Sequence, residues 1–172
     1  MSVTTFFQND SYLSKTSRSL ISGFVGGLAG TAVKSLIEYY LPVRKVQDRS
    51  AQIKIIDDLS TKITGTPIST SNEALAEQLV NVPFGGSLGA AYGYGKKDRE
   101  GLRPMDGIAF GATTWASTHE TSLPILGLER KPTDTPVKMQ MNELFAHIAF
   151  GVTTEVVRFY VNRQLHYKRV RK

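Results

Sequence analysis

Six ionisable residues lie inside stretches of the chain that are otherwise apolar, and their types could hold or move protons. An imidazole has an ordinary pKa near 6.5, so it changes charge over the range in which an outer compartment acidifies. A charged side chain in the middle of a bilayer costs roughly 2.5 to 3.5 kcal/mol, so such residues normally have partners there. The sequence therefore predicts a proton-responsive polar cluster, whose members are Lys34, Glu38, His119, Glu120, Glu143 and His147.

The spacing of these residues is helical. Residues three or four positions apart share one face of a helix and can pair. The pairs with this spacing are Lys34/Glu38, Glu143/His147 and Glu155/Arg158. The last pair lies at the opposite depth from the cluster and is predicted to form a separate inner ion pair. Pro124 lacks an N–H, so it should kink its helix and leave a polar pocket beside His119 and Glu120.

Four apolar stretches must position these side chains. Each is near the length of about 20 residues that a helix needs to cross the hydrocarbon core of a membrane. We predict spans at about residues 20–41, 77–95, 105–128 and 143–162. The mean hydropathy of −0.17 is low for a membrane protein, so a soluble helical domain is the alternative.

Glycines four residues apart favour the membrane interpretation. This spacing places both glycines on one helix face and lets another backbone approach closely. In a soluble helix each glycine costs about 1 kcal/mol relative to alanine, whereas a bilayer penalises every non-helical conformation more. We therefore predict an all-α fold: an integral membrane four-helix bundle. The packing glycines are Gly23, Gly27, Gly30, Gly85, Gly89, Gly93, Gly107 and Gly111. They could pack within one chain or between chains, so the sequence leaves open whether the protein forms a homo-oligomer.

The charge distribution predicts an orientation. The chain carries a formal net charge of +6. With four spans, one side holds eleven Lys and Arg residues and the other holds eight, five of which are spread through a long first loop. The positive-inside rule then places both termini in the cytoplasm. The predicted organisation is a polar N-terminal segment (1–18), a single transmembrane domain (19–165) and a basic C-terminal tail (166–172).

The first loop contains a further helical pattern. Ile53, Ile56, Leu59 and Ile63 recur at helical spacing with charged residues between them, which predicts an amphipathic helix on the outer surface. Thr70 with Glu73 three residues later has the pattern of a capping box, so the second long helix should begin near residue 71.

Several function classes lack support. The chain has no cysteine, so disulfides, thiolate metal sites and cysteine nucleophiles are excluded. There is no phosphate-binding or dinucleotide glycine loop, and Ser117 and His119 are two apart and do not face each other as nucleophile and base. We expect no enzyme activity, no cofactor and no metal ligands. A basic nucleic-acid binder has only the charge in its favour, because no binding motif is present.

Three patterns together resemble a known family. They are Lys34-x3-Glu38-x3-Pro42-x-Arg44, His119-x4-Pro124-x2-Gly127 and Glu143-x3-His147-x7-Glu155-x2-Arg158. In this order, over about residues 20 to 165, they resemble the YagU-like family of small bacterial inner-membrane proteins. The resemblance implies a multi-pass protein of the bacterial inner membrane and offers no activity. This chain differs in its more polar, glycine-richer spans and in its first loop, which does not match.

Two other interpretations of the polar residues remain open. They could serve only as hydrogen-bonding contacts between helices, worth about 0.6 to 2 kcal/mol each. Alternatively, His119 and His147 could hold a metal ion or a haem, since neutral imidazole is a ligand for both. In each case the expected surroundings include the lipid bilayer as a partner.

Overall fold

The computed structural model describes residues 13–42, 49–99 and 101–170, in which every regular element is helical. The long helices are α1 (Lys15–Tyr40), α2 (Ala51–Thr64), α3 (Glu73–Gly95), α4 (Pro104–Ser117) and α6 (Val137–Val170). Between α4 and α6 lie a π-helical turn (Thr118–Ser122), the short α5 (Leu123–Ile125) and a 3-10 turn (Pro132–Asp134). The predicted all-α class is confirmed. Some sequence predictions fall on residues that are not described. These are the family pattern at Arg44, residues 1–12 of the N-terminal segment and residues 171–172 of the C-terminal tail.

Side-chain and glycine caps fix the ends of the first two helices. The Ser14 hydroxyl accepts a hydrogen bond from the N–H of Ser17 (3.0 Å) at the start of α1, and Ser50 does the same for Ile53 in α2 (3.4 Å). Gly65 ends α2 with φ of 78°, a conformation that glycine adopts without steric penalty. The helix predicted in the first loop is therefore present.

The predicted capping box at the start of α3 is wrong. A 3-10 turn, Thr70–Asn72, precedes the helix, and no side chain caps the first turn of α3 at Glu73. In this turn the N–H of Asn72 donates to the carbonyl of Ser69 (2.9 Å), and the N–H of Glu73 donates to the carbonyl of Thr70. Backbone carbonyls thus accept the hydrogen bonds from the N–H groups that a capping side chain would have satisfied.

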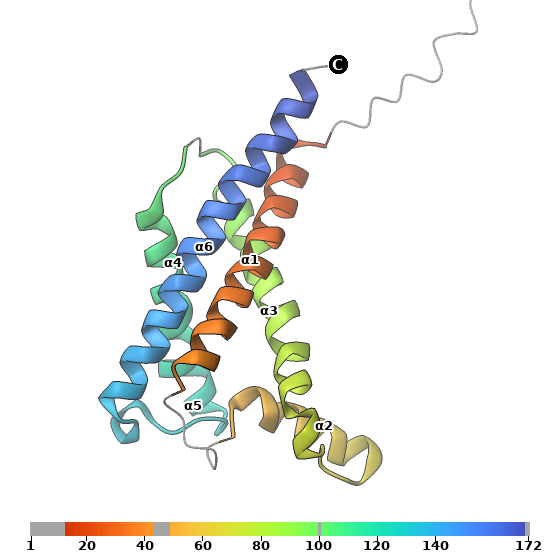
Figure 1. Cartoon of the computed structure of the whole chain (residues 1–172), viewed down its shortest axis with the longest axis vertical. Coiled ribbons are helices and arrows are strands. Elements are labelled where there is room, and N and C mark those ends of the chain that lie inside the picture. The colour runs from red at the N-terminus through yellow and green to blue at the C-terminus, as the bar shows by residue number, and fades with distance from the viewer. Residues whose placement is uncertain (1–12, 43–48, 100, 171–172) are drawn as a thin grey trace, which may run out of the picture.

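The long helices form a row. α1 packs against both α3 and α6, and α6 also packs against α4, which gives the order α3, α1, α6, α4 (Figure 1). The start of α1, the α3–α4 connection and the end of α6 lie at one end of the molecule, which we call the terminal end. The opposite end carries α2 and α5 and is called the α2 end. α3 diverges from α1 toward the α2 end.

Glycines bring the helix backbones into contact. A Cβ atom on Gly89 would overlap the carbonyl oxygen of Gly23, so α1 and α3 touch through their main chains. A Cβ on Gly111 would overlap the carbonyl oxygen of His147 in the same way, between α4 and α6. The glycines singled out in the sequence lie between α1 and α3 (Gly23, Gly27, Gly85, Gly89, Gly93), between α1 and α6 (Gly30) and between α4 and α6 (Gly107, Gly111).

The interior is polar and the exterior is apolar. Among the described residues, twelve polar or charged side chains are buried, against six apolar ones. Glu155 is only 1% exposed, while Phe24 in α1 is 43% exposed and Leu79 in α3 is 60% exposed. A water-soluble domain has the opposite distribution, because apolar burial stabilises its fold.

Within the described residues, two helices are long and apolar enough, by length and composition, to cross a membrane. They are α1 and the segment Val137–His166 of α6, which correspond to the first and fourth predicted spans. α4 itself has 14 residues and gives way to the π-helical turn at Thr118. α6 continues through Val170, so most of the segment expected to be a tail is helical.

Candidate functional site

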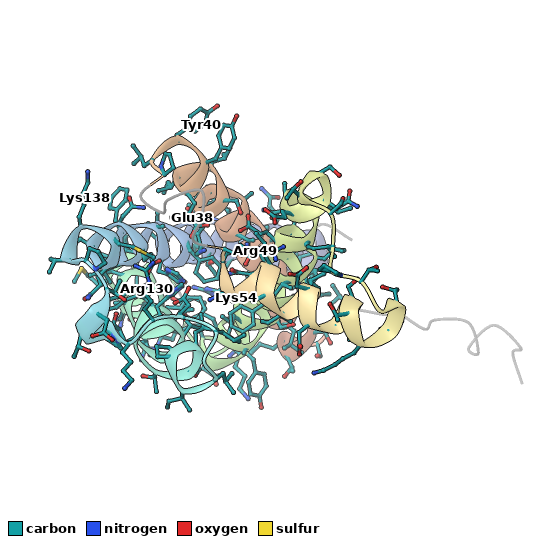
Figure 2. All side chains as sticks on the ribbon, turned by 90° about the horizontal axis from the view of Figure 1, so that it is seen from below. Glu38, Tyr40, Arg49, Lys54, Arg130 and Lys138 are labelled. Atoms are coloured by element: carbon teal, nitrogen blue, oxygen red, sulfur yellow. The ribbon has the colours of Figure 1, made fainter. Side chains whose placement is uncertain are left out.

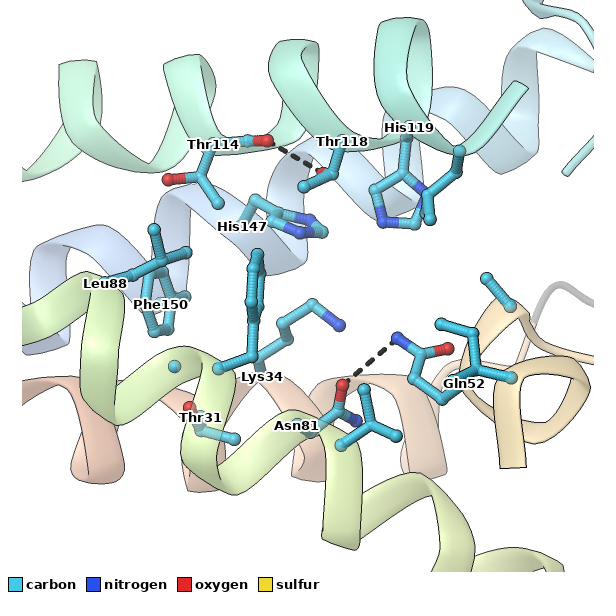
Figure 3. A pocket seen from close by; sticks show the side chains of 16 residues that line it. Thr31, Lys34, Gln52, Asn81, Leu88, Thr114, Thr118, His119, His147 and Phe150 are labelled. Carbon is cyan, nitrogen blue, oxygen red and sulfur yellow. Dashed lines mark hydrogen bonds between the residues drawn. The ribbon is translucent and has the colours of Figure 1, made fainter. Parts of the chain in front are cut away.

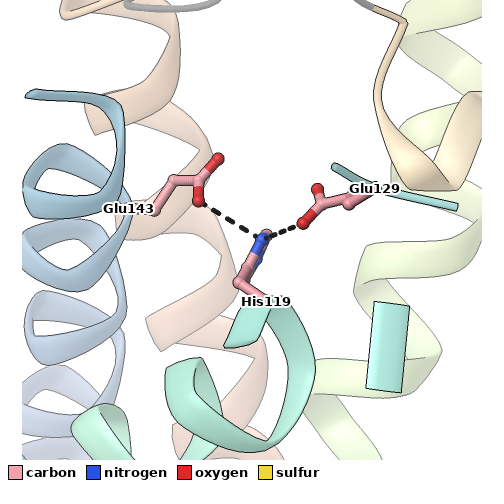
Figure 4. Close-up of side chains that lie close together, drawn as sticks. All are labelled: His119, Glu129 and Glu143. Carbon is pink, nitrogen blue, oxygen red and sulfur yellow. Dashed lines mark hydrogen bonds and ion pairs between the residues drawn. The ribbon is translucent and has the colours of Figure 1, made fainter. Parts of the chain in front are cut away.

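His119 is the centre of a polar cluster at the α2 end. Its Nδ1 atom lies 2.7 Å from Oε2 of Glu129 and 3.4 Å from Oε2 of Glu143 (Figure 4). The side chains of His119 and Glu143 are 6% and 7% exposed, so water screens these interactions little. Two carboxylates thus face one imidazole nitrogen in a buried setting, and this nitrogen is the hydrogen-bond donor because an ionised carboxylate only accepts.

A π-helical turn and a chain reversal bring Glu129 to His119. The hydroxyls of Thr121 and Ser122 donate to carbonyls five residues earlier, at Ala116 (2.9 Å) and Ser117 (2.6 Å), which satisfies the widened turn. Helix α5 then ends, and Gly127, with φ of 70°, reverses the chain. The helix therefore ends at Ile125, short of the predicted residue 128, and the π-helical turn lies just before Pro124, where the sequence predicted a kink. π-Helical turns are frequent at functional sites.

His147 completes the cluster from α6. Its Nδ1 donates to the backbone carbonyl of Glu143 (2.8 Å), so this nitrogen carries the proton. The rings of His119 and His147 meet edge to face with centroids 4.9 Å apart. We call His119, Glu129, Glu143 and His147 the His119 cluster. The pair Glu143/His147 shares a helix face as spacing predicted, but the Glu143 carboxylate faces His119.

Lys34 and Glu38 form an ion pair next to the cluster. The Lys34 Nζ atom lies 2.6 Å from Oε1 of Glu38, and the lysine side chain is 12% exposed. Lys34 also lines the same cavity as His119 and His147 (Figure 3). Glu120, which sequence reasoning placed in the cluster, lines a second cavity together with His119, but the carboxylates that contact His119 are those of Glu129 and Glu143.

Three cavities meet at His119. The first, of about 150 Å³, lies among α1, α3, α4, α6 and the start of α2 and is lined mostly by apolar side chains such as Phe84 and Leu88. The other two, of about 230 and 330 Å³, lie at the α2 end, and Glu143 lines both. The His119 cluster therefore stands between an internal cavity and the surface at this end.

Basic side chains border the entrance on one side. Arg49, Lys54 and Arg130 line the second cavity and lie toward the middle of the α2 end, whereas Tyr40 and Lys138 lie at its margin (Figure 2). Lys54 donates to the carbonyl of Leu128 (2.7 Å) and so attaches α2 to the chain reversal that carries Glu129.

The inner ion pair forms a separate network toward the terminal end. Arg158 donates twice to Glu155, through Nε (2.7 Å) and Nη2 (2.8 Å). The Tyr92 hydroxyl (3.0 Å) and the backbone N–H of Arg103 (3.1 Å) donate to the same carboxylate. The Phe110 ring stacks on Tyr92 with centroids 4.3 Å apart and contacts Phe150 at 5.6 Å. These aromatic rings lie between the inner ion pair and the internal cavity, which Phe150 lines.

A family comparison identifies the chain. A model of the proteins of unknown function called DUF1440 matches residues 28–156, which is three quarters of the sequence. The chain belongs to the DUF1440 family. The matched range includes the His119 cluster and Glu155 of the inner ion pair. No curated protein and no solved structure matches the chain.

Within this DUF1440 domain, the residue that sequence reasoning missed is Glu129. His119, Glu129 and Glu143 bring their ligand atoms within 4.8 Å of one another, a set that could hold a metal ion. Sequence spacing showed no third ligand, because Glu129 is ten residues from His119 and reaches it only through the chain reversal. The signal that could have found it is the Pro124-x2-Gly127 turn directly before Glu129.

Proposed function

We propose that this DUF1440 protein is a YagU-like protein of the bacterial inner membrane with both termini in the cytoplasm. Its spans are α1, α3, α4 with its continuation to Ile125, and α6. Twelve buried polar side chains inside a largely apolar exterior support this placement, because lipid tolerates apolar side chains outside while polar groups pair inside. Tyr39 and Tyr40 at the α2 end and Tyr94 and Tyr160 toward the terminal end are exposed, as in interfacial aromatic belts.

Cysteine labelling tests this placement cleanly, because the chain has no native cysteine. Ser87, Asp98 and Thr133 are exposed in the structure. In intact cells, an impermeant thiol reagent should label Thr133→Cys from outside, label Asp98→Cys only after permeabilisation, and label Ser87→Cys only after denaturation. If Ser87→Cys reacts as readily as Thr133→Cys in the native protein, the helices do not lie in lipid and the proposal fails.

We infer that the His119 cluster is a proton-responsive site on the outer side of this membrane. The observation that carries the inference is the position of His119 Nδ1, in contact with two carboxylates where three cavities meet. Protons can arrive through the cavities at the α2 end. Glu129 and Glu143 would lie beside the imidazole that receives the proton.

Protonation would change the charge beside the internal cavity. In the neutral state His119 donates through Nδ1 and can accept a proton on Nε2. The new positive charge would face His147 at 4.9 Å and the Lys34 ammonium group across the same cavity. The aromatic rings of Phe110 and Phe150 separate this region from the inner ion pair. This separation favours a site that senses external protons over an unbroken proton path across the membrane.

The single tryptophan provides the test. Trp115 lies one turn before His119 in α4, so its fluorescence should follow the charge of the cluster. For the protein in lipid nanodiscs, we expect a fluorescence transition between about pH 5 and 8. His119→Gln should abolish it, and His147→Gln should shift it. His166→Gln is the matched control, because the third histidine lies at the terminal end and should leave the transition unchanged.

Growth at low external pH and proton flux into proteoliposomes extend the test. If the double variant His119→Gln/His147→Gln keeps the fluorescence transition, the flux and the acid growth of the parent, the proton-responsive site is wrong. If that variant is only less stable and the parent shows no transition, the polar residues are contacts between helices.

A divalent cation site is the second candidate function, favoured by the 4.8 Å grouping of His119, Glu129 and Glu143. One imidazole and two carboxylates suit manganese, iron or zinc. Elemental analysis of protein purified without chelators should then give about one metal per chain, lost in Glu129→Gln and kept in Glu120→Gln. If protein purified without chelators contains no metal and still shows the fluorescence transition, this candidate is excluded. A haem held by both histidines has no space, because their rings are 4.9 Å apart and nearly perpendicular.

A further inference from the structure

Another polar cavity lies at the terminal end, and its lining carries the positive charge that an anion-binding site needs. It measures about 270 Å³ and lies between the first turns of α1, the α3–α4 connection and the second half of α6. No carboxylate is among the described side chains that line it. Its six cationic lining residues are Lys15, Arg18, Lys97, Arg99, Arg158 and Arg163.

Arg18 is the buried cation of this cavity. Only 8% of the residue is exposed, and its Nε atom is buried without a hydrogen-bond partner in the described part of the chain. Its Nη1 atom donates to Nδ1 of His166 (2.5 Å). Because a guanidinium can only donate, that nitrogen of His166 is the acceptor. Within the described residues, no contact of Arg18 thus places a negative charge beside its buried guanidinium.

The described acidic side chains nearby, Asp98, Asp106 and Glu155, already have cationic partners. Asp98 pairs with Lys15 (2.8 Å), and Glu155 pairs with Arg158 (2.7 Å). Asp106 lies 2.9 Å from Lys96 and 3.5 Å from Arg99. A buried charge that lacks a counter-ion destabilises a fold by several kcal/mol, so Arg18 calls for an anion from outside the described chain.

We propose that this cavity, named the Arg18 cavity, binds a phosphate group. Guanidinium groups present several N–H donors in a planar fork that matches phosphate oxygens. The Arg18 Nε–H would donate to one phosphate oxygen, and Lys97 and Arg99 would contribute charge at the opening of the cavity. The phosphate belongs either to the headgroup of an anionic phospholipid or to a free phosphate compound. The proposal does not depend on the His119 cluster.

Ligand-dependent stability distinguishes the two sources. A ligand that binds only the folded state raises the melting temperature with concentration. The full chain in neutral detergent should melt at a higher temperature with inorganic phosphate than with chloride at equal ionic strength if the source is free phosphate. If the source is a lipid, phosphatidylglycerol should give the rise and phosphatidylcholine should not. A rise in either arm supports the proposal, and no rise in both overturns it.

Variants localise the effect. Arg18→Gln should weaken the apparent affinity for the active probe about tenfold or more, since it removes a charged hydrogen bond. Lys138→Gln removes one exposed positive charge at the α2 end and should keep the affinity of the parent. If Arg18→Gln does not fold, the double variant Lys97→Gln/Arg99→Gln tests the opening of the cavity without touching a buried side chain. Equal affinity in this double variant and in Lys138→Gln would mean that binding reflects overall charge, and the site would be wrong.

Discussion

The two buried polar regions of this protein are the inner ion pair and the His119 cluster, and they differ in how completely their hydrogen-bonding groups are paired. The inner ion pair is saturated, because the Glu155 carboxylate accepts two bonds from Arg158, one from Tyr92 and one from a backbone N–H. The His119 cluster contains two imidazoles whose rings meet edge to face, and cavities reach it from the α2 end. A network whose hydrogen bonds are all made, and which lies behind aromatic rings, suits a structural role. A network with imidazoles beside cavities suits the proposed response to protons.

The comparison teaches that burial alone does not identify a functional site. Glu155 is the more deeply buried carboxylate, at 1% exposure against 5% for Glu143. Its partner is an arginine in the same helix, which stays protonated at every physiological pH. His119, in contrast, meets carboxylates from outside its own helix, and its imidazole can act as donor or acceptor. The experiments below separate these roles by stability and by pH response.

The largest expected effect comes from breaking the inner ion pair. Glu155→Gln leaves the Arg158 guanidinium buried without its carboxylate, which should cost about 3 to 5 kcal/mol of folding free energy. Denaturation of the purified protein in detergent measures this loss. Asp98→Asn is the control, because it also breaks a carboxylate–cation pair but both of its side chains are exposed. If the two variants are equally stable, the inner ion pair does not hold the fold.

A smaller effect should follow from separating α4 and α6 next to the His119 cluster. Gly111→Ala places a Cβ against the His147 carbonyl, so the helices must shift, at a cost of about 1 to 3 kcal/mol. Gly95→Ala at the end of α3 meets no atom within 4 Å and should be neutral or slightly stabilising. The same denaturation assay compares the two variants. If Gly111→Ala is as stable as Gly95→Ala, the close backbone contact between α4 and α6 does not constrain the fold.

The His119 cluster should contribute less to stability than the inner ion pair does. His119→Gln keeps a hydrogen-bond donor near Glu129, so we expect a loss of about 1 kcal/mol, together with loss of the Trp115 response to pH. Measuring both quantities on the same preparation sharpens the contrast between the two regions. A stability loss as large as that of Glu155→Gln would assign both regions the same structural role.

The smallest effect concerns the attachment of α2 at the cavity entrance. Arg49 pairs with Asp57 and with Glu73 (2.8 Å). Burial raises the pKa of Asp57, but the hydrogen bond from Arg49, the N–H of Ile68 (2.9 Å) and the charge of Arg49 outweigh it and hold the pKa below its ordinary value. The resulting stabilisation is present above an ordinary aspartate pKa of about 3.9 and is lost as the pH falls below it.

Hydrogen exchange in α2 measures this attachment. Asp57→Asn should increase exchange of α2 amides at neutral pH, and the parent should approach the variant as the pH falls through the range below 4. Asp58→Asn, which removes an exposed carboxylate that pairs with Lys62 within α2, is the control. If both variants exchange alike, Arg49 does not fix α2 to the rest of the molecule.

Local patterns predicted the local structure of this protein. Lys34 and Glu38 lie four apart and form an ion pair, and Glu155 and Arg158 lie three apart and form another. The helix of the first loop also follows from its pattern of isoleucine and leucine. These features depend on neighbours within one helix, so the period of the helix is sufficient to predict them.

Long-range contacts escaped this kind of reasoning. Spacing could not show that Glu129 contacts His119 from beyond a chain reversal, or that His119 lies in a π-helical turn. Nor could it show that Arg18 is buried beside His166, which is 148 residues away.

The sequence by itself determined that the chain is helical, that its small residues permit close helix contacts, and which titratable side chains lie in apolar stretches. Only the tertiary structure decided which of those side chains meet and which cavities reach them. The physical reason is that helix periodicity relates residues three or four apart, whereas the meeting of distant residues depends on where helices cross and where loops reverse the chain.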